Sequence, residues 1–149
     1  MIKTNIAEEE MLKQYGGNPA LTLIQYSAIV HPIVGDKPSK ADLAQWVAFV
    51  VSVWNACVVF QVTGDSKPTL DICNRIQAMQ ATDTHAAVLH GAVMREIIDR
   101  KMHENRNASW LYSDSDVYVD GDSLRVTAEV WTFGQWQASG KNLTSGRMN

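Results

Sequence analysis

Four side chains of one predicted helix have the chemistry that acid–base catalysis or metal binding needs: His85, Glu96, Asp99 and His103. At 3.6 residues per turn they gather on one side of a helix predicted over residues 83–105. Asp99 and His103 lie one turn apart, so the carboxylate could orient the imidazole as either chemistry requires. One functional hypothesis is therefore a small metal-assisted or acid–base enzyme that uses these four residues.

The competing interpretation of the same helix is a charged face in contact with solvent. Glu96 and Asp99 do not make the Glu-x-x-His motif of carboxylate-bridged metal sites, and no second such motif occurs. His85 lies eleven positions before Glu96, about 16 Å along a helix axis, so these two side chains cannot share one ion. Basic residues interleave with the acidic ones, as on a salt-bridged surface: Arg95, Arg100, Lys101 and Arg106. We therefore predict no bound metal and no cofactor.

Three aromatic residues near the end of the chain form the second candidate site: Trp131, Phe133 and Trp136. Trp131 alternates with the apolar residues of a predicted strand, so its ring is expected to face away from the core. Outward aromatic side chains at a sheet edge are typical of surfaces that bind another protein. We predict that these three rings bind a partner. The alternative is that the C-terminal segment folds back and covers them.

Other motifs with known chemistry do not occur in the sequence. There is no G-x-S-x-G, glycine-rich phosphate loop, H-E-x-x-H or paired C-x-x-C. The aspartates between residues 114 and 122 lack EF-hand spacing, and we interpret them as turn and strand-end residues. Cys57 and Cys73 each lie in an apolar helical pattern, so both are expected to be buried free thiols.

Composition limits the class of protein. The chain has 149 residues, of which 46% are hydrophobic, and this suits one globular domain with a real core. The net charge of -3 gives no electrostatic reason to bind nucleic acid. The first residues lack the basic start and apolar run of a secretion signal, so we expect a cytoplasmic protein.

Helical patterns dominate the first two thirds of the sequence. Asn18-Pro19 carries a helix-start signal, and Ser39 with Asp42 resembles a capping box. Helices are predicted over about 5–16, 19–31, 43–62, 69–80 and 83–105. From residue 117 the pattern alternates across a turn at 120–122, which predicts an antiparallel hairpin ending at Trp131. Residues 109–112 are a candidate third strand.

These elements predict an α+β fold. A mainly helical body of about five helices is followed by a C-terminal antiparallel β-hairpin or three-stranded sheet. Residues 1–133 form the single predicted domain. Residues 134–149 form a polar tail that is expected to be loosely held.

The segment 43–62 is apolar around most of its circumference. Its valine pairs would also suit two buried strands, and its length would suit a membrane span. Against a membrane span, four polar residues are costly in hydrocarbon: Gln45, Ser52, Asn55 and Gln61. Such a helix is either the hub of the domain or an interface with another copy, and the two roles are compatible. We predict a homo-oligomer, most simply a two-fold dimer.

The favoured function is a small cytoplasmic, non-catalytic protein-interaction module of the immunity, assembly or regulatory type. Its partner is a second copy of the chain or another protein; nucleic acid is not expected, and neither is a membrane. The alternative is the enzyme that uses the His/Asp/Glu face of helix 83–105. A single-pass membrane protein is a third interpretation.

Overall fold

The structure is a computed structural model, and it describes residues 2–3, 17–35, 37–120 and 123–139. Its helices are α2 (Pro19–Ser27), α3 (His31–Val34), α4 (Lys40–Thr63), α5 (Lys67–Gln80), α6 (Thr84–His103) and α7 (Phe133–Ser139). Its strands are β1 (Ile2–Lys3), β2 (Leu111–Asp120) and β3 (Ser123–Trp131). The fold is α+β, with a mainly helical body followed by an antiparallel hairpin, and this part of the prediction is confirmed.

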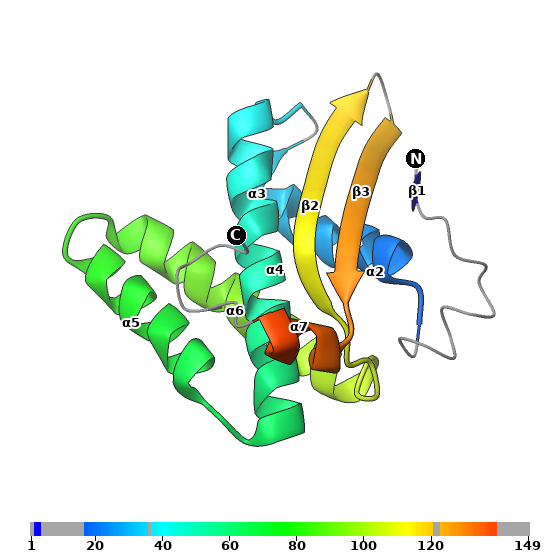
Figure 1. Cartoon of the computed structure of the whole chain (residues 1–149). Coiled ribbons are helices and arrows are strands. Elements are labelled where there is room, and N and C mark those ends of the chain that lie inside the picture. Colours follow the sequence, from blue (N-terminus) through cyan, green and yellow to red (C-terminus); the bar gives the residue numbers. More distant parts are fainter. Residues whose placement is uncertain (1, 4–16, 36, 121–122, 140–149) are drawn as a thin grey trace.

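Helix α4 is the centre of the molecule and separates the sheet from the pair α5 and α6 (Figure 1). The helices α4 and α6 run in the same direction, because Trp46 of α4 stacks on His90 of α6 and Gln61 of α4 contacts Lys101 of α6. Helix α5, which connects them in the chain, runs in the opposite direction and packs on their outer side (Figure 1). Helix α2 covers the face of the hairpin that points away from the viewer.

The segment predicted over 43–62 is one helix and not two strands. The Ser39 hydroxyl accepts a hydrogen bond from the backbone N–H of Asp42 and begins α4. Gly64 ends it in the left-handed conformation, with φ at 77°, where a side chain would be strained. Eleven residues of α4 between Leu43 and Val59 are buried within the chain, and those from Val53 to Val59 form an unbroken run. The hub role is therefore observed, and the interface role stays a prediction.

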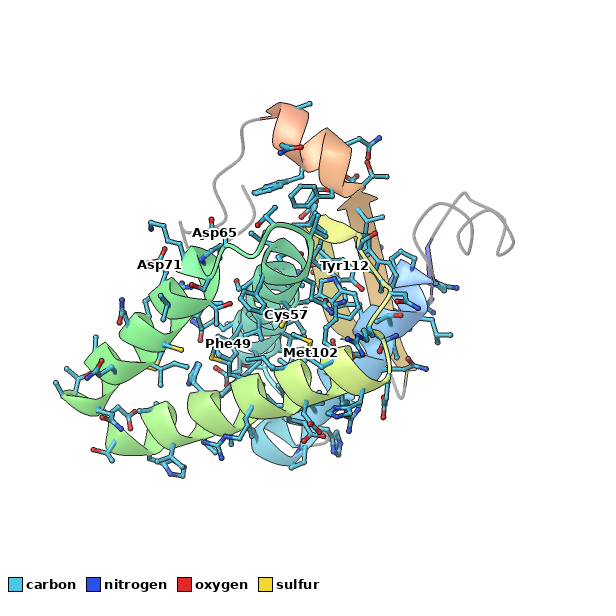
Figure 2. The ribbon with its side chains drawn as sticks, turned by 90° about the horizontal axis from the view of Figure 1, so that it is seen from below. Phe49, Cys57, Asp65, Asp71, Met102 and Tyr112 are labelled. Carbon is cyan, nitrogen blue, oxygen red and sulfur yellow. The ribbon has the colours of Figure 1, made fainter. Side chains whose placement is uncertain are left out.

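By length and composition, α4 is the one described helix that could cross a membrane. Most of its apolar window is buried against other elements of this chain. Figure 2 shows the same arrangement from below, with Cys57 of α4 in the interior and Asp71 of α5 at the outer rim.

The chain after α2 differs from the prediction. The helix was expected to end at His31 because the residue before a proline avoids helical angles. Instead, a 3-10 turn over Ala28–Val30 leads directly into α3, and Gly35 ends that helix with φ at 78°. Pro32 lies in the first turn of α3, where a helix does not need the N–H that proline lacks.

The sheet has three strands in the order β1-β3-β2. Its third strand is β1, which pairs in parallel with β3 at Val126 and Thr127. The candidate third strand over 109–112 is wrong as a separate strand, because Leu111 and Tyr112 begin β2. A register shift between Tyr112 and Asp114 marks a β-bulge in β2. The helix predicted over 5–16 lies outside the described residues.

The start of the predicted polar tail is helical. Thr132 and Gln135 form a capping box, in which the Thr132 hydroxyl accepts from the Gln135 N–H and the Gln135 side chain accepts from the Thr132 N–H. This box begins α7, whose Phe133 and Trp136 pack against the core. Residues 140–149 lie outside the described residues. The two cysteines are free, but only Cys57 is buried; Cys73 is exposed, contrary to the prediction.

Candidate functional site

The four candidate catalytic residues stay on the outer side of α6. His85, Asp99 and His103 are exposed, and Glu96 is half-buried. Glu96 forms an ion pair with Arg100 at 3.0 Å, while His103 Nδ1 lies 3.2 Å from Asp99 Oδ1 and 2.8 Å from the Asp99 backbone oxygen. Over the described parts of the chain, no group of three or more His, Cys, Asp or Glu could hold a metal ion. The structure thus brings together pairs along one helix face and no larger constellation.

Lys101 is not part of a solvated basic stretch, as the sequence suggested; it is fully buried. Its Nζ donates to Gln61 Oε1 at 2.8 Å and to the backbone oxygens of Asn105 and Ala108 at 2.9 and 2.7 Å. It also lies 4.7 Å from the centre of a Trp54 ring, a cation–π distance. Burial lowers the pKa of the Lys101 ammonium to about 8, and the nearby Cys57 raises it slightly. The three acceptors match the three N–H groups of an ammonium, so Lys101 attaches the α6–β2 connection to α4.

Two aromatic side chains near Lys101 also use their polar atoms in hydrogen bonds within the protein. Trp54 Nε1 donates to the backbone oxygen of Trp110 at 3.0 Å, and the two indoles stack at 4.9 Å. The Tyr26 hydroxyl donates to Asn105 Oδ1 at 2.7 Å, and burial raises the pKa of that hydroxyl well above its usual range. These groups hold the core together and are not aimed at an open cleft.

Asn55, the most polar residue of the buried half of α4, is fully buried and binds a strand edge. Its Nδ2 donates to the Tyr112 backbone oxygen at 3.1 Å, and its Oδ1 accepts from the Tyr112 N–H at 2.9 Å. The side-chain amide thus replaces a neighbouring strand at the edge of β2. This pairing holds α4 in register against the sheet.

One face of the hairpin is left uncovered by the described helices, apart from α7 at its lower end (Figure 1). Alternation along β3 places Ala128 and Val130 on the face that packs against the core. Figure 2 shows α7 and α2 on opposite sides of the hairpin. We call the other face the open face, and its described residues are Asp114 and Asp116 of β2 with Arg125, Thr127, Glu129 and Trp131 of β3.

The open face carries three carboxylates that are exposed: Asp114, Asp116 and Glu129. Asp114 pairs directly with Glu129 in the strand register, so two like charges face each other. Like charges directly opposite each other in an antiparallel pair destabilise a sheet. Asp114 Oδ1 accepts only from the N–H of Ser115, and no ion pair within the described residues reaches any of the three.

A buried hydroxyl lies beside these carboxylates. Ser113 is the extra residue of the β-bulge, so Ser113 and Asp114 together oppose Glu129. Ser113 is 7% exposed, and its Oγ has no hydrogen-bond partner among the described residues. This oxygen is closed off from solvent, as are the other buried polar atoms of the described residues that lack a hydrogen-bond partner, on Ser27, Trp110 and Trp136.

The three predicted partner-binding aromatics are half-buried. Phe133 and Trp136 lie 5.2 Å apart on α7 and pack against the core, as in the alternative that the C-terminal segment folds back. Trp131 stands at the lower end of the open face, opposite Leu111. Of the three predicted partner-binding residues, Trp131 lies at the edge of the open face, whereas the sequence analysis assigned Asp114 and Asp116 to turns and strand ends.

The described polar side chains fall into three groups by their surroundings. The buried groups of Lys101, Trp54 and Asn55 bind other parts of the core, His85 and His103 are exposed on α6, and the carboxylates of Asp114, Asp116 and Glu129 are exposed on the open face. Comparison of the chain with protein-family models, with curated proteins and with solved structures finds no match.

Proposed function

We propose that this protein is a non-catalytic protein-interaction domain of the cytoplasm. Its binding surface is the open face of the hairpin together with the aromatics at its lower end, Trp131, Phe133 and Trp136. The domain would act by holding a partner, in an immunity, assembly or regulatory role. We also propose that the chain self-associates as a dimer, which the apolar character of helix α4 around most of its circumference supports.

The observation that carries the proposal is the facing pair of Asp114 and Glu129 on an uncovered sheet face. In the free chain this pair costs stability, since like charges lie opposite each other in the strand register. Proteins keep locally unfavourable groups mainly where function uses them. A partner that covers the face would relieve the repulsion.

The proposal is tested by the affinity of a purified partner. A tagged full chain is expressed in its source cells, and each protein that co-purifies is produced alone and titrated against the purified chain. Thr127→Trp places a bulky indole ring in the middle of the open face. The control variant Ala92→Trp places the same ring on the exposed side of α6.

We expect Thr127→Trp to weaken the partner's binding at least tenfold and Ala92→Trp to leave it unchanged. Equal affinities for both variants would contradict the proposed surface. Light scattering at micromolar concentration tests self-association separately: a mass of twice 16.6 kDa is expected, and a single 16.6 kDa species would refute the dimer.

A further inference from the structure

Helix α7 is held to the core by a small apolar contact. Of its seven residues, Phe133 and Trp136 are half-buried and pack against the core, while the other five are exposed. Figure 2 shows α7 at the margin of the molecule, beyond the end of β3. An isolated helix of this length is not stable in water. The two rings therefore supply the packing that keeps α7 folded.

Several hydrogen bonds shape α7 without joining it to another element. The capping box lies between Thr132 and Gln135, and the Trp136 N–H donates to the Thr132 backbone oxygen at 3.1 Å. Ser139 Oγ donates to the Trp136 backbone oxygen at 2.6 Å. Thr132 is the single residue between β3 and α7, so it is the place where the helix can hinge.

Two features weaken the docked state of α7. The Trp136 indole Nε1 is closed off from solvent and has no hydrogen-bond partner among the described residues. A buried donor without an acceptor costs free energy, and this cost ends when the ring returns to water. Gly134 lies inside the helix, where glycine loses more chain entropy on folding than alanine does. Both features favour an undocked α7.

We propose that α7 is a hinged cover at the lower end of the hairpin, which undocks while the rest of the fold stays intact and so presents the rings of Phe133 and Trp136 to a partner. This inference rests on the proposed function. It explains how two rings that pack against the core in the free chain can bind another protein.

The rings define the chemistry of the partner. Undocking turns two aromatic side chains, and the core surface that they cover, toward solvent, so the partner contributes apolar side chains to the contact. An oxygen beside them on the partner accepts the hydrogen bond that Trp136 Nε1 lacks in the free chain.

Hydrogen exchange of the isotope-labelled full chain, followed by NMR below the midpoint of urea unfolding, tests the cover without a partner. The indole N–H groups of Trp54 and Trp136 are both buried, and a rigid structure protects both. We expect protection of the Trp136 indole and of the amides of residues 136–139 to be lower than that of the Trp54 indole by about tenfold or more. Their exchange should depend little on urea, because local opening exposes little surface.

Two glycine variants separate local from global opening. A Cβ at Gly134 or at Gly91 meets no atom within 4 Å, so alanine fits at both positions. Gly134→Ala should slow exchange of the Trp136 indole by about two- to fivefold, while Gly91→Ala in α6 should leave it unchanged. Thr132→Ala with Gln135→Ala removes the capping box and should speed this exchange by about twofold or more.

Three results would overturn the cover. The first is exchange of the Trp136 indole with the same protection and urea dependence as the Trp54 indole, because α7 would then open only when the whole chain unfolds. The second is equal slowing of the Trp136 indole by Gly91→Ala and Gly134→Ala. The third is fast exchange of the Trp136 indole while the amides of residues 136–139 stay as protected as Trp54.

Binding of the purified partner tests the presentation of the rings. Trp136→Ala should weaken the affinity by about tenfold or more, whereas Gln137→Ala, at an exposed position of the same helix, should leave it unchanged. Equal affinities of these two variants would refute the presentation.

Failure of this inference is distinguishable from failure of the proposed function. If α7 opens only with the whole chain but Thr127→Trp weakens the partner's binding, the cover is refuted and the interaction role stands. If α7 undocks but Thr127→Trp and Ala92→Trp bind the partner equally, the open face is refuted and the undocking stands.

Discussion

Raising the pH from 7 to 9 should stabilise this protein, and Lys101 is the reason. Burial lowers the pKa of Lys101 to about 8, against 10.5 for an exposed lysine. Between these values the unfolded chain binds more protons than the folded chain, so stability rises with pH. Over pH 7–9 the Lys101 contribution is about 1 kcal/mol.

Cys57 opposes this gain but does not cancel it. Burial raises the pKa of its thiol to about 11, from an ordinary value of 9.0. The folded chain then holds a proton that the unfolded chain releases, so stability falls as the pH rises through 9. Tyr26 and Tyr112, whose pKa values are also raised by burial, act mainly above their ordinary value of 10.0. The net gain for the wild type remains positive up to about pH 9.

The assay is urea unfolding followed by tryptophan fluorescence at pH 7, 8 and 9. For Lys101→Met, the free energy of unfolding should no longer increase between pH 7 and 9 and should instead decrease slightly. The change in this free energy from pH 7 to 9 should then differ from that of the wild type by about 1 kcal/mol. Lys67→Met, which removes an exposed lysine from a surface ion pair, should keep the wild-type profile. Parallel pH profiles for wild type and Lys101→Met would refute the reasoning. If Lys101→Met does not fold, NMR titration of the Lys101 side chain gives the same answer, since a midpoint above pH 10 would contradict its burial.

Four further outcomes are expected. Asn55→Leu leaves the buried N–H and C=O of Tyr112 unpaired, so it should destabilise the fold by about 2–4 kcal/mol in urea unfolding. Gly91→Ala should stabilise it by about 0.5–1 kcal/mol in the same assay, because a Cβ at this α6 position meets no atom within 4 Å. Asp99→Ala and His103→Ala should each change stability by less than about 1 kcal/mol, since both side chains are more than two-thirds exposed. Elemental analysis should find no stoichiometric metal; about one zinc, iron or manganese per chain, lost in His103→Ala, would restore the enzyme hypothesis.

Elements with strong local signals could be predicted from the sequence. Asn18 and Asp83 accept hydrogen bonds from the N–H groups of Leu21 and Ala86, so the helix starts were visible as single capping residues. The start of α7 has the same kind of signal, because Thr132-x-x-Gln135 is a capping-box sequence. The polar residues that follow it hide the helix, since they lack a clear apolar stripe.

Lys101 was predicted to lie on a solvated surface because of its charge, although its position in the helix pattern indicates burial. It follows Met94 and Ile97 at helical spacing, on the stripe that faces α4. A lysine on such a stripe can be buried when backbone oxygens accept from its ammonium. Those acceptors, at Asn105 and Ala108, belong to a connection whose path the sequence does not reveal.

The open face depends on tertiary register. Alternation along β3 correctly set Glu129 and Trp131 on the outward side of the hairpin. The pairing of Glu129 with Asp114 requires the bulge at Ser113, directly after the residue that Asn55 binds from α4. A one-residue difference in register would have placed Asp114 elsewhere, so the carboxylate pair could not be foreseen from strand pattern alone.

The central claim is that the open face is where another protein binds. Its most direct test is hydrogen exchange of the full chain, alone and saturated with the purified partner. We predict slower exchange of amides in residues 113–116 and 127–131, with no change on the exposed side of α6. Unchanged exchange across the open face, with protection at α6 or at the α4–α5 turn instead, would contradict the claim.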